Sequence, residues 1–247
     1  MQAPIFLLLG LIVGSFINVL IVRIPRGESI IHPGSRCPEC GHDLKAFELI
    51  PVLSFIMLRG KCRECGSSIP LRYPLVELTA GLMFLGNWYL AAELVELISG
   101  MVLITLLLPL SVIDLREQIL PDKLNLAGMA AGLALSFFRA DFTPLASISG
   151  ILAGGGFLFA LAFISRGGIG GGDIKLMLFT GSFLGAPLAL ISIFLAAILG
   201  LIASLPSLFR GRLGLRSKLP FGPFLALAAL ILWYYGSELL SFYLQLF

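Results

Sequence analysis

The sequence predicts an all-α polytopic membrane protein with about eight transmembrane helices and one small polar domain between the first two spans. Composition is the first indication, because 58% of the 247 residues are hydrophobic and only 13% are charged, which is far more apolar than a soluble domain. The second is a repetition of apolar runs near the length of about 20 residues that crosses a bilayer. The third is a single polar stretch, residues 23–73, that interrupts these runs.

Glycine, proline and charged clusters divide the apolar sequence into eight predicted spans. They are Pro4–Val22, Pro74–Ala91, Leu97–Ile113, Leu124–Phe138, Leu145–Ile164, Ile174–Leu184, Leu188–Leu208 and Phe221–Phe242. The first run has no basic residue before it and has Arg23 and Arg26 behind it, so we expect a retained span and no cleaved signal peptide. The sixth is short and lies between Gly172 and Gly185-Ala-Pro187, which leaves seven spans or a re-entrant segment as an alternative.

Two features of the first span predict close packing against another helix. Gly10 and Gly14 form a Gly-x-x-x-Gly face, and small residues at this spacing let two helix backbones approach each other. Asn18 is a polar side chain within the span, so we expect it to make an interhelical hydrogen bond.

Basic residues set the predicted orientation. If Arg23 is cytoplasmic and the chain crosses at every predicted span, the Lys and Arg residues collect on the cytoplasmic side and only Arg139 falls on the other. The basic cluster from Arg210 to Lys218 is then predicted to contact anionic lipid headgroups. Three predicted domains follow: a first span at 1–22, a cytoplasmic domain at 23–73 and a transmembrane core at 74–247. The net charge of +3, without a basic tail, argues against nucleic acid as a partner.

All four cysteines lie in the cytoplasmic domain, in two C-x-x-C motifs with 21 residues between them. They are Cys37, Cys40, Cys62 and Cys65. Gly41 and Gly66 follow the motifs, where a tight turn needs glycine, and this pattern is typical of a zinc knuckle. We expect a structural Zn²⁺, because four cysteines leave no open position for water, and we therefore predict a cytoplasmic zinc-knuckle domain. Two disulfides and an idle pair of redox motifs are the alternatives, and cytoplasmic placement disfavours the disulfides. The histidines, His32 and His42, are predicted to be solvated loop residues, with His42 as a possible replacement ligand.

Four carboxylates lie in or near predicted spans, where ionisable groups are costly and so mark functional sites. They are Glu77, Asp114, Asp122 and Asp173. Asp114 closes the third span and Asp173 opens the sixth after a run of glycines, so the two crossings between them return both residues to the cytoplasmic edge. Two carboxyl groups that share one proton are the chemistry of aspartic proteases, in which one acts as base toward water and the other as acid toward the scissile carbonyl. The glycines let a peptide backbone approach closely.

Other interpretations of these carboxylates remain open. Asp173 could cap a helix, Asp122 could interact with a helix dipole, and Asp114 could pair with Arg116 or Lys123. For Glu77 we expect packing and pairing with a basic residue. A proton-coupled transporter would also carry intramembrane aspartates, but near mid-membrane on facing helices. A zinc-knuckle membrane adaptor without catalysis and a presenilin-like intramembrane protease are further alternatives.

Six motifs, taken in order along the chain, resemble the bacterial type IV prepilin peptidase family. They are Gly14-Ser-Phe-Ile-Asn-Val19 with Arg23-Ile-Pro25, the paired C-x-x-C motifs, Arg72-Tyr-Pro-Leu-Val-Glu77, Ile113-Asp-Leu-Arg116 with Leu120-Pro-Asp122, Gly170-Gly-Gly-Asp173 and Pro220-Phe-Gly-Pro223. The resemblance covers nearly the whole chain.

This resemblance implies an enzyme of the bacterial cytoplasmic (inner) membrane that removes the leader from type IV prepilins and type II secretion pseudopilins at the cytoplasmic face. It also implies methylation of the new N-terminus with S-adenosylmethionine, associated with the cysteine-bearing domain. The catalytic pair maps onto Asp114 and Asp173, with Asp122 as the alternative partner. Gly171 departs from the family, in which larger residues are common at this position. No Rossmann-like glycine turn is present, so the resemblance alone carries the methyltransferase and assigns no residue to its cofactor.

Overall fold

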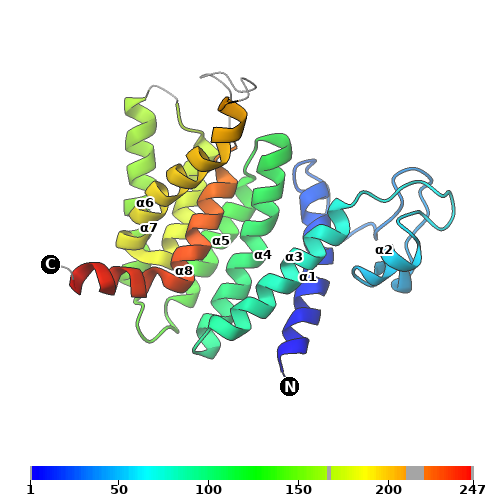
Figure 1. Ribbon diagram of the computed structural model, residues 1–247, viewed down its shortest axis with the longest axis horizontal. Helices are drawn as coiled ribbons and strands as arrows, with labels where there is room; N and C mark the ends of the chain where they lie inside the picture. Colours follow the sequence, from blue (N-terminus) through cyan, green and yellow to red (C-terminus); the bar gives the residue numbers. More distant parts are fainter. Residues whose placement is uncertain (1, 166–167, 210–219, 246–247) are drawn as a thin grey trace. The chain divides into compact units, whose positions relative to one another are not determined.

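A computed structural model describes residues 2–165, 168–209 and 220–245 of the chain (Figure 1). The predicted basic cluster from Arg210 to Lys218 lies outside these residues. The chain forms two compact units, Met1–Ala91 and Ala92–Phe247. The described residues are helical and contain no strand beyond isolated bridges, which confirms the all-α prediction.

Five helices within the described residues are long and apolar enough to cross a membrane. These stretches are Ala3–Arg23 (α1), Leu94–Glu117 (α4), Pro144–Ile164 (α6), Gly171–Pro206 within α7 (Gly171–Phe209) and Gly222–Phe242 within α8 (Gly222–Gln245). Two shorter helices, α3 (Arg72–Leu90) and α5 (Asp122–Leu135), coincide with the second and fourth predicted spans. The prediction of a multi-pass membrane protein is therefore confirmed, whereas the count of eight spans stays a prediction.

In the first unit, α1 packs along α3 (Figure 1). Gly10 and Gly14 form the contact face, and a Cβ at Gly14 would lie 2.6 Å from the Cα of Glu77, so a larger residue would push the helices apart. Asn18 Nδ2 donates to the carbonyl oxygen of Tyr73 across the helix pair, at 3.1 Å. Both predictions for the first span are confirmed.

Between α1 and α3 the chain forms two copies of the same knuckle, together with a short 3₁₀ helix, η1 (Ala46–Leu49), and α2 (Leu53–Met57). In the first copy Cys37 N–H donates to the carbonyl of His42 at 2.9 Å, and in the second Cys62 N–H donates to that of Ser67 at 2.8 Å. Each turn closes on a glycine with positive φ, which is 73° at Gly41 and 71° at Gly66. This conformation explains why glycine follows each motif.

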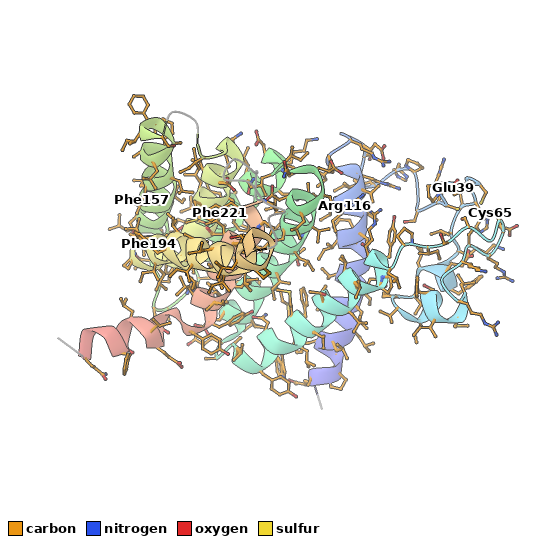
Figure 2. The ribbon with its side chains drawn as sticks, turned by 45° about the horizontal axis from the view of Figure 1, so that its top comes forward. Glu39, Cys65, Arg116, Phe157, Phe194 and Phe221 are labelled. Carbon is orange, nitrogen blue, oxygen red and sulfur yellow. The ribbon has the colours of Figure 1, made fainter. Side chains whose placement is uncertain are left out.

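In the second unit, α7 packs against α5, α6 and α8, and α4 packs against α5 and α8. The α6–α7 contact is closest where Gly150 meets Gly181, because a Cβ on either would collide with the backbone of the other. Farther along this pair, the rings of Phe157 and Phe194 have centroids 6.1 Å apart (Figure 2). This packing brings the end of α4 to the beginnings of α5, α7 and α8.

Candidate functional site

Asp114 lies in the last turn of α4 and is buried, with 6% of its surface exposed. Its Oδ2 accepts a hydrogen bond of 3.0 Å from the backbone N–H of Gly222. Gly222 begins α8, so this N–H is one of those that a helix leaves without a partner inside itself. The start of α8 therefore holds the Asp114 carboxyl group in place.

Two glycines and Leu120 fit tightly around this carboxyl group. A Cβ on Gly222 would lie 2.8 Å from Asp114 Oδ2 and 3.1 Å from Leu120 Cδ2, and a Cβ on Gly172 would lie 2.9 Å from Leu120 Cβ. The Leu120 side chain therefore packs against the start of both α7 and α8. The sequence did not assign these roles, although Leu120 and Gly222 lie in motifs that it singled out.

Asp173 is the third residue of α7 and is partly exposed. Its N–H donates to the carbonyl of Gly170 at 3.1 Å, and its carboxylate is close enough to Asp114 for the two charges to interact. Neither aspartate takes part in a salt bridge among the described residues, which include Arg116 and Lys123. The two aspartates thus come together where the helix ends converge.

Asp122, the alternative partner, has a different environment. It opens α5, and both of its carboxylate oxygens lie 2.7 Å from Lys175 Nζ. Both side chains of this pair face solvent, with 58% of Asp122 and 43% of Lys175 exposed. Asp122 therefore has a cationic partner of its own.

The four cysteines form a cluster in which all sulfur atoms lie within 4.8 Å of one another. None forms a disulfide, and the Sγ atoms are 3.9 Å apart for Cys37 and Cys65 and 4.0 Å apart for Cys40 and Cys62. Four sulfurs at about 2.3 Å from one Zn²⁺ would be separated by ~3.8 Å. The predicted four-cysteine cluster is confirmed, and its geometry fits a tetrahedral metal ion.

Hydrogen bonds within the knuckles favour the thiolate form that a metal requires at Cys37 and Cys65, whereas burial and the neighbouring thiols raise the pKa of Cys40 to about 12. The backbone N–H of Cys40 is the main cause that lowers the pKa of Cys37 to about 6, against the opposing effect of burial. The side chain and the backbone of Ser67 lower the pKa of Cys65 in the same way.

The histidines lie outside this cluster. His32 is exposed, as predicted, but His42 is largely covered and its Nε2 lies 3.2 Å from the Glu48 carboxylate. The backbone N–H of Lys45 also donates to Glu48 at 2.8 Å, and this hydrogen bond, followed by that of His42, holds the pKa of Glu48 below its ordinary value. His42 is therefore the partner of a buried carboxylate, and the prediction of a solvated residue was wrong for it.

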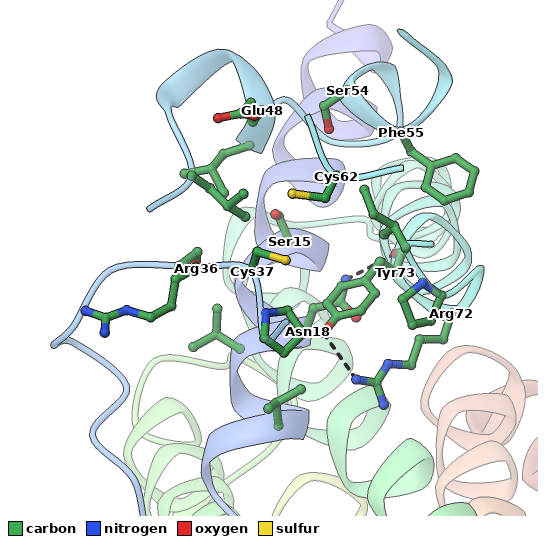
Figure 3. Close-up of a pocket in the computed structure, with 18 of the residues that line it drawn as sticks. Ser15, Asn18, Arg36, Cys37, Glu48, Ser54, Phe55, Cys62, Arg72 and Tyr73 are labelled. Carbon is green, nitrogen blue, oxygen red and sulfur yellow. Dashed lines mark hydrogen bonds between the residues drawn. The ribbon is translucent and has the colours of Figure 1, made fainter. Parts of the chain in front are cut away.

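The first unit also has an open cavity of about 740 Å³ between α1, the knuckles and α3 (Figure 3). Buried Cys37 and Cys62 line it, as does Glu77, which is 8% exposed. Glu77 accepts a 2.8 Å hydrogen bond from the backbone N–H of Val52 and belongs to no salt bridge of the described residues. The expected basic partner of Glu77 is thus replaced by a backbone donor.

Comparison with known proteins identifies both halves of the chain. The model of the bacterial peptidase A24 N-terminal domain matches residues 8–91, and that of the type IV leader peptidase family matches residues 101–205. A prepilin leader peptidase/N-methyltransferase of Bacillus subtilis is 34% identical over 242 aligned residues, covering 98% of this chain and 98% of the relative.

Another protein of that name, from Burkholderia pseudomallei, is 35% identical over 276 aligned positions that cover all of this chain and 88% of the relative. One from Myxococcus xanthus is 50% identical over 135 residues, which cover 55% of this chain and 40% of the relative. No solved structure matches the chain. The sequence resemblance is therefore confirmed, and the chain belongs to the type IV leader peptidase family.

Proposed function

We propose that this protein is an aspartyl endopeptidase of the bacterial inner membrane that removes the leader from type IV prepilins and type II secretion pseudopilins at the cytoplasmic face. It has eight spans and a cytoplasmic zinc-knuckle domain, and it methylates the new N-terminus with S-adenosylmethionine. The names of its relatives, which are prepilin leader peptidases and N-methyltransferases, support both activities.

The meeting of Asp114 and Asp173 carries the peptidase proposal. These carboxylates interact with each other and lack a cationic partner among the described residues, whereas Asp122 is bound to Lys175. Both lie at helix ends, and a transporter would place them near the middle of facing spans. The geometry therefore favours a dyad at one edge of the helix bundle.

In this dyad one carboxylate removes a proton from water while the other, protonated, donates to the oxygen of the scissile carbonyl. The new C–O bond gives a tetrahedral intermediate, which breaks its C–N bond as a proton passes to the leaving amine. Gly222 N–H keeps Asp114 in position throughout. The exposed face of Asp173 leaves an approach for the peptide.

Replacing either aspartate tests the dyad. Asp114→Asn and Asp173→Asn should each lower leader removal by at least ~100-fold, because general acid–base catalysis contributes about 10²–10⁴-fold. Asp122→Asn should retain most activity, and Asp141→Asn, exposed before α6, is the matched control. The measurement is the mass of a purified prepilin incubated with each variant in detergent. Full processing by the Asp114 or Asp173 variant would reject the dyad.

The cysteine cluster supports a structural zinc ion, because the four thiols match a tetrahedral site in number and spacing. A polar segment this short has little core of its own, so a metal would stabilise its fold.

Methyl transfer uses S-adenosylmethionine, which supplies a methyl group on a sulfonium. The nitrogen of the freed amine bonds to the methyl carbon as the C–S bond breaks toward sulfur, and the amine then loses a proton. In the same mass measurement, labelled S-adenosylmethionine should add one methyl group to the processed product.

A further inference from the structure

We propose that the cavity of the first unit is the S-adenosylmethionine site, where Arg72 binds the carboxylate of the methionine moiety and Glu77 faces its cationic groups. This inference rests on the proposed methyltransferase function and extends it by naming the residues. All residues that line the cavity belong to the first unit.

Size and lining fit a ligand of this class. A volume of about 740 Å³ falls in the usual range of ~300–1,000 Å³ for small-molecule sites. Apolar residues such as Val19, Val22 and Leu58 form part of the wall, and polar side chains converge from α1, the knuckles and α3 (Figure 3). Such a mixture suits a molecule with an apolar thioether chain, a purine and several polar groups.

Arg72 provides a donor that nothing in the described protein uses. Its Nε is buried without a hydrogen-bond partner, whereas Nη2 donates to the Tyr73 hydroxyl at 3.2 Å and the guanidinium lies 4.8 Å from the centroid of that ring. A buried donor without a partner destabilises the protein, so a ligand carboxylate at Nε would relieve this cost. Guanidinium groups bind carboxylates through paired N–H donors.

Two other charged residues that line the cavity have partners of their own. Arg23 donates to the carbonyls of Ser29 and Gly34, both at 2.9 Å, and Glu48 accepts from Lys45 and His42. These groups hold the knuckle segment in place.

Glu77 complements Arg72. It accepts one hydrogen bond from Val52 N–H and another from Ser15, which leaves acceptor capacity because each carboxylate oxygen has two lone pairs. S-Adenosylmethionine carries one carboxylate, one ammonium and one sulfonium, so a guanidinium and a buried carboxylate in one cavity match the opposite charges of its amino-acid moiety.

Binding of the donor alone tests this site without relying on catalysis. Equilibrium dialysis of labelled S-adenosylmethionine against the purified full chain should show affinity that falls roughly tenfold or more in Arg72→Gln and in Glu77→Gln. Arg59→Gln and Glu64→Gln, exposed and outside the lining, are the matched controls and should bind as the unmodified protein does. All four variants should still remove the leader, and their unfolding midpoints report whether each is folded.

A second measurement is independent of the variants. Ultraviolet cross-linking of labelled S-adenosylmethionine should mark peptides within residues 15–77, and S-adenosylhomocysteine should prevent it. Cross-linking confined to residues 92–247, or unchanged binding of S-adenosylmethionine by folded Arg72→Gln, would overturn the proposed site. If the unmodified protein still transferred a methyl group in that case, the proposed methyltransferase function would stand. Competition by glycerophosphoethanolamine and not by S-adenosylhomocysteine would indicate a lipid-headgroup site and would also overturn it.

Discussion

The glycines before Asp173 are not equivalent at the scale of single residues. The sequence interpreted the whole run as backbone that a substrate can approach. In the structure, a Cβ at Gly171 would have no atom within 4 Å, whereas one at Gly172 would lie 2.9 Å from Leu120 Cβ. Of these two glycines, Gly172 therefore needs the absence of a side chain for packing.

Alanine at these adjacent positions should separate the two roles. Gly172→Ala should shift Leu120 or the start of α7 and lower leader removal by up to ~100-fold, since a displacement of about 1 Å near a reacting centre can cost that much. Gly171→Ala is the matched control and should keep nearly full activity. Rates of prepilin processing at equal amounts of folded enzyme provide the comparison, and equal losses in both variants would contradict it.

Local spacing explains which site residues the sequence could predict. The cysteine cluster depends on two short motifs, and Asn18 is recognisable as a polar group within a span, so both were found in advance. The hydrogen bond from Gly222 to Asp114 joins residues 108 positions apart, and no local pattern encodes such a contact. The same holds for Arg72, whose unpartnered donor is visible only once its surroundings are known.

At the scale of elements, the break within α7 decides how two predicted spans are connected. Gly185 has φ 75° and ψ 171°, a conformation essentially restricted to glycine, and a second helix follows directly beyond this kink. Arg139 Nη1 donates to the carbonyl of Phe183 at 3.0 Å, and its guanidinium stacks on Phe142 and Trp233. Arg139, the basic residue that the charge pattern placed alone on the far side, thus has a structural role at this break.

The sequence marked this break correctly from Gly185-Ala-Pro187, and the two predicted spans beside it correspond to two helices that meet at Gly185 without a connecting loop. Glycine and proline reveal where a helix is interrupted, but whether the chain leaves the helix there depends on the partners of the freed carbonyls. Here Arg139 satisfies one of them.

Substitutions at the break should therefore reduce stability. Gly185→Ala should lower the free energy of unfolding by about 1–3 kcal/mol through backbone strain, and Arg139→Gln by a similar ~1–3 kcal/mol through loss of the bond to Phe183. Gly156→Ala, in α6 with open space around its Cβ, is the control and should change little. Denaturant unfolding in detergent measures each value; a Gly185 variant as stable as the control would contradict the strain argument.

At the scale of the whole molecule, the two candidate chemistries belong to different compact units. The cysteine cluster and the cavity lie in residues 1–91, and Asp114 and Asp173 lie in residues 92–247. The predicted division at residue 73 stays a prediction about function. The contacts in the structure place α3 in the same unit as α1, because the glycine face of α1 packs on α3. A hydropathy pattern identifies spans but cannot show which spans pack together.

Zinc removal should consequently affect the two activities unequally. The metal would hold Cys37 and Cys62, which line the cavity, so its loss should release the knuckles and abolish S-adenosylmethionine binding and methyl transfer. Leader removal depends on the other unit and should fall by no more than about twofold, within the ~0.5 kcal/mol typical of changes remote from a site. Metal analysis should find one zinc per chain in the untreated protein. It should find none after chelation or in the double variant Cys37→Ser/Cys62→Ser. Added zinc should restore methylation to the chelated protein but not to the double variant. Unchanged metal content in the double variant would reject the zinc site, and parallel loss of both activities in folded protein would show that the units do not work separately.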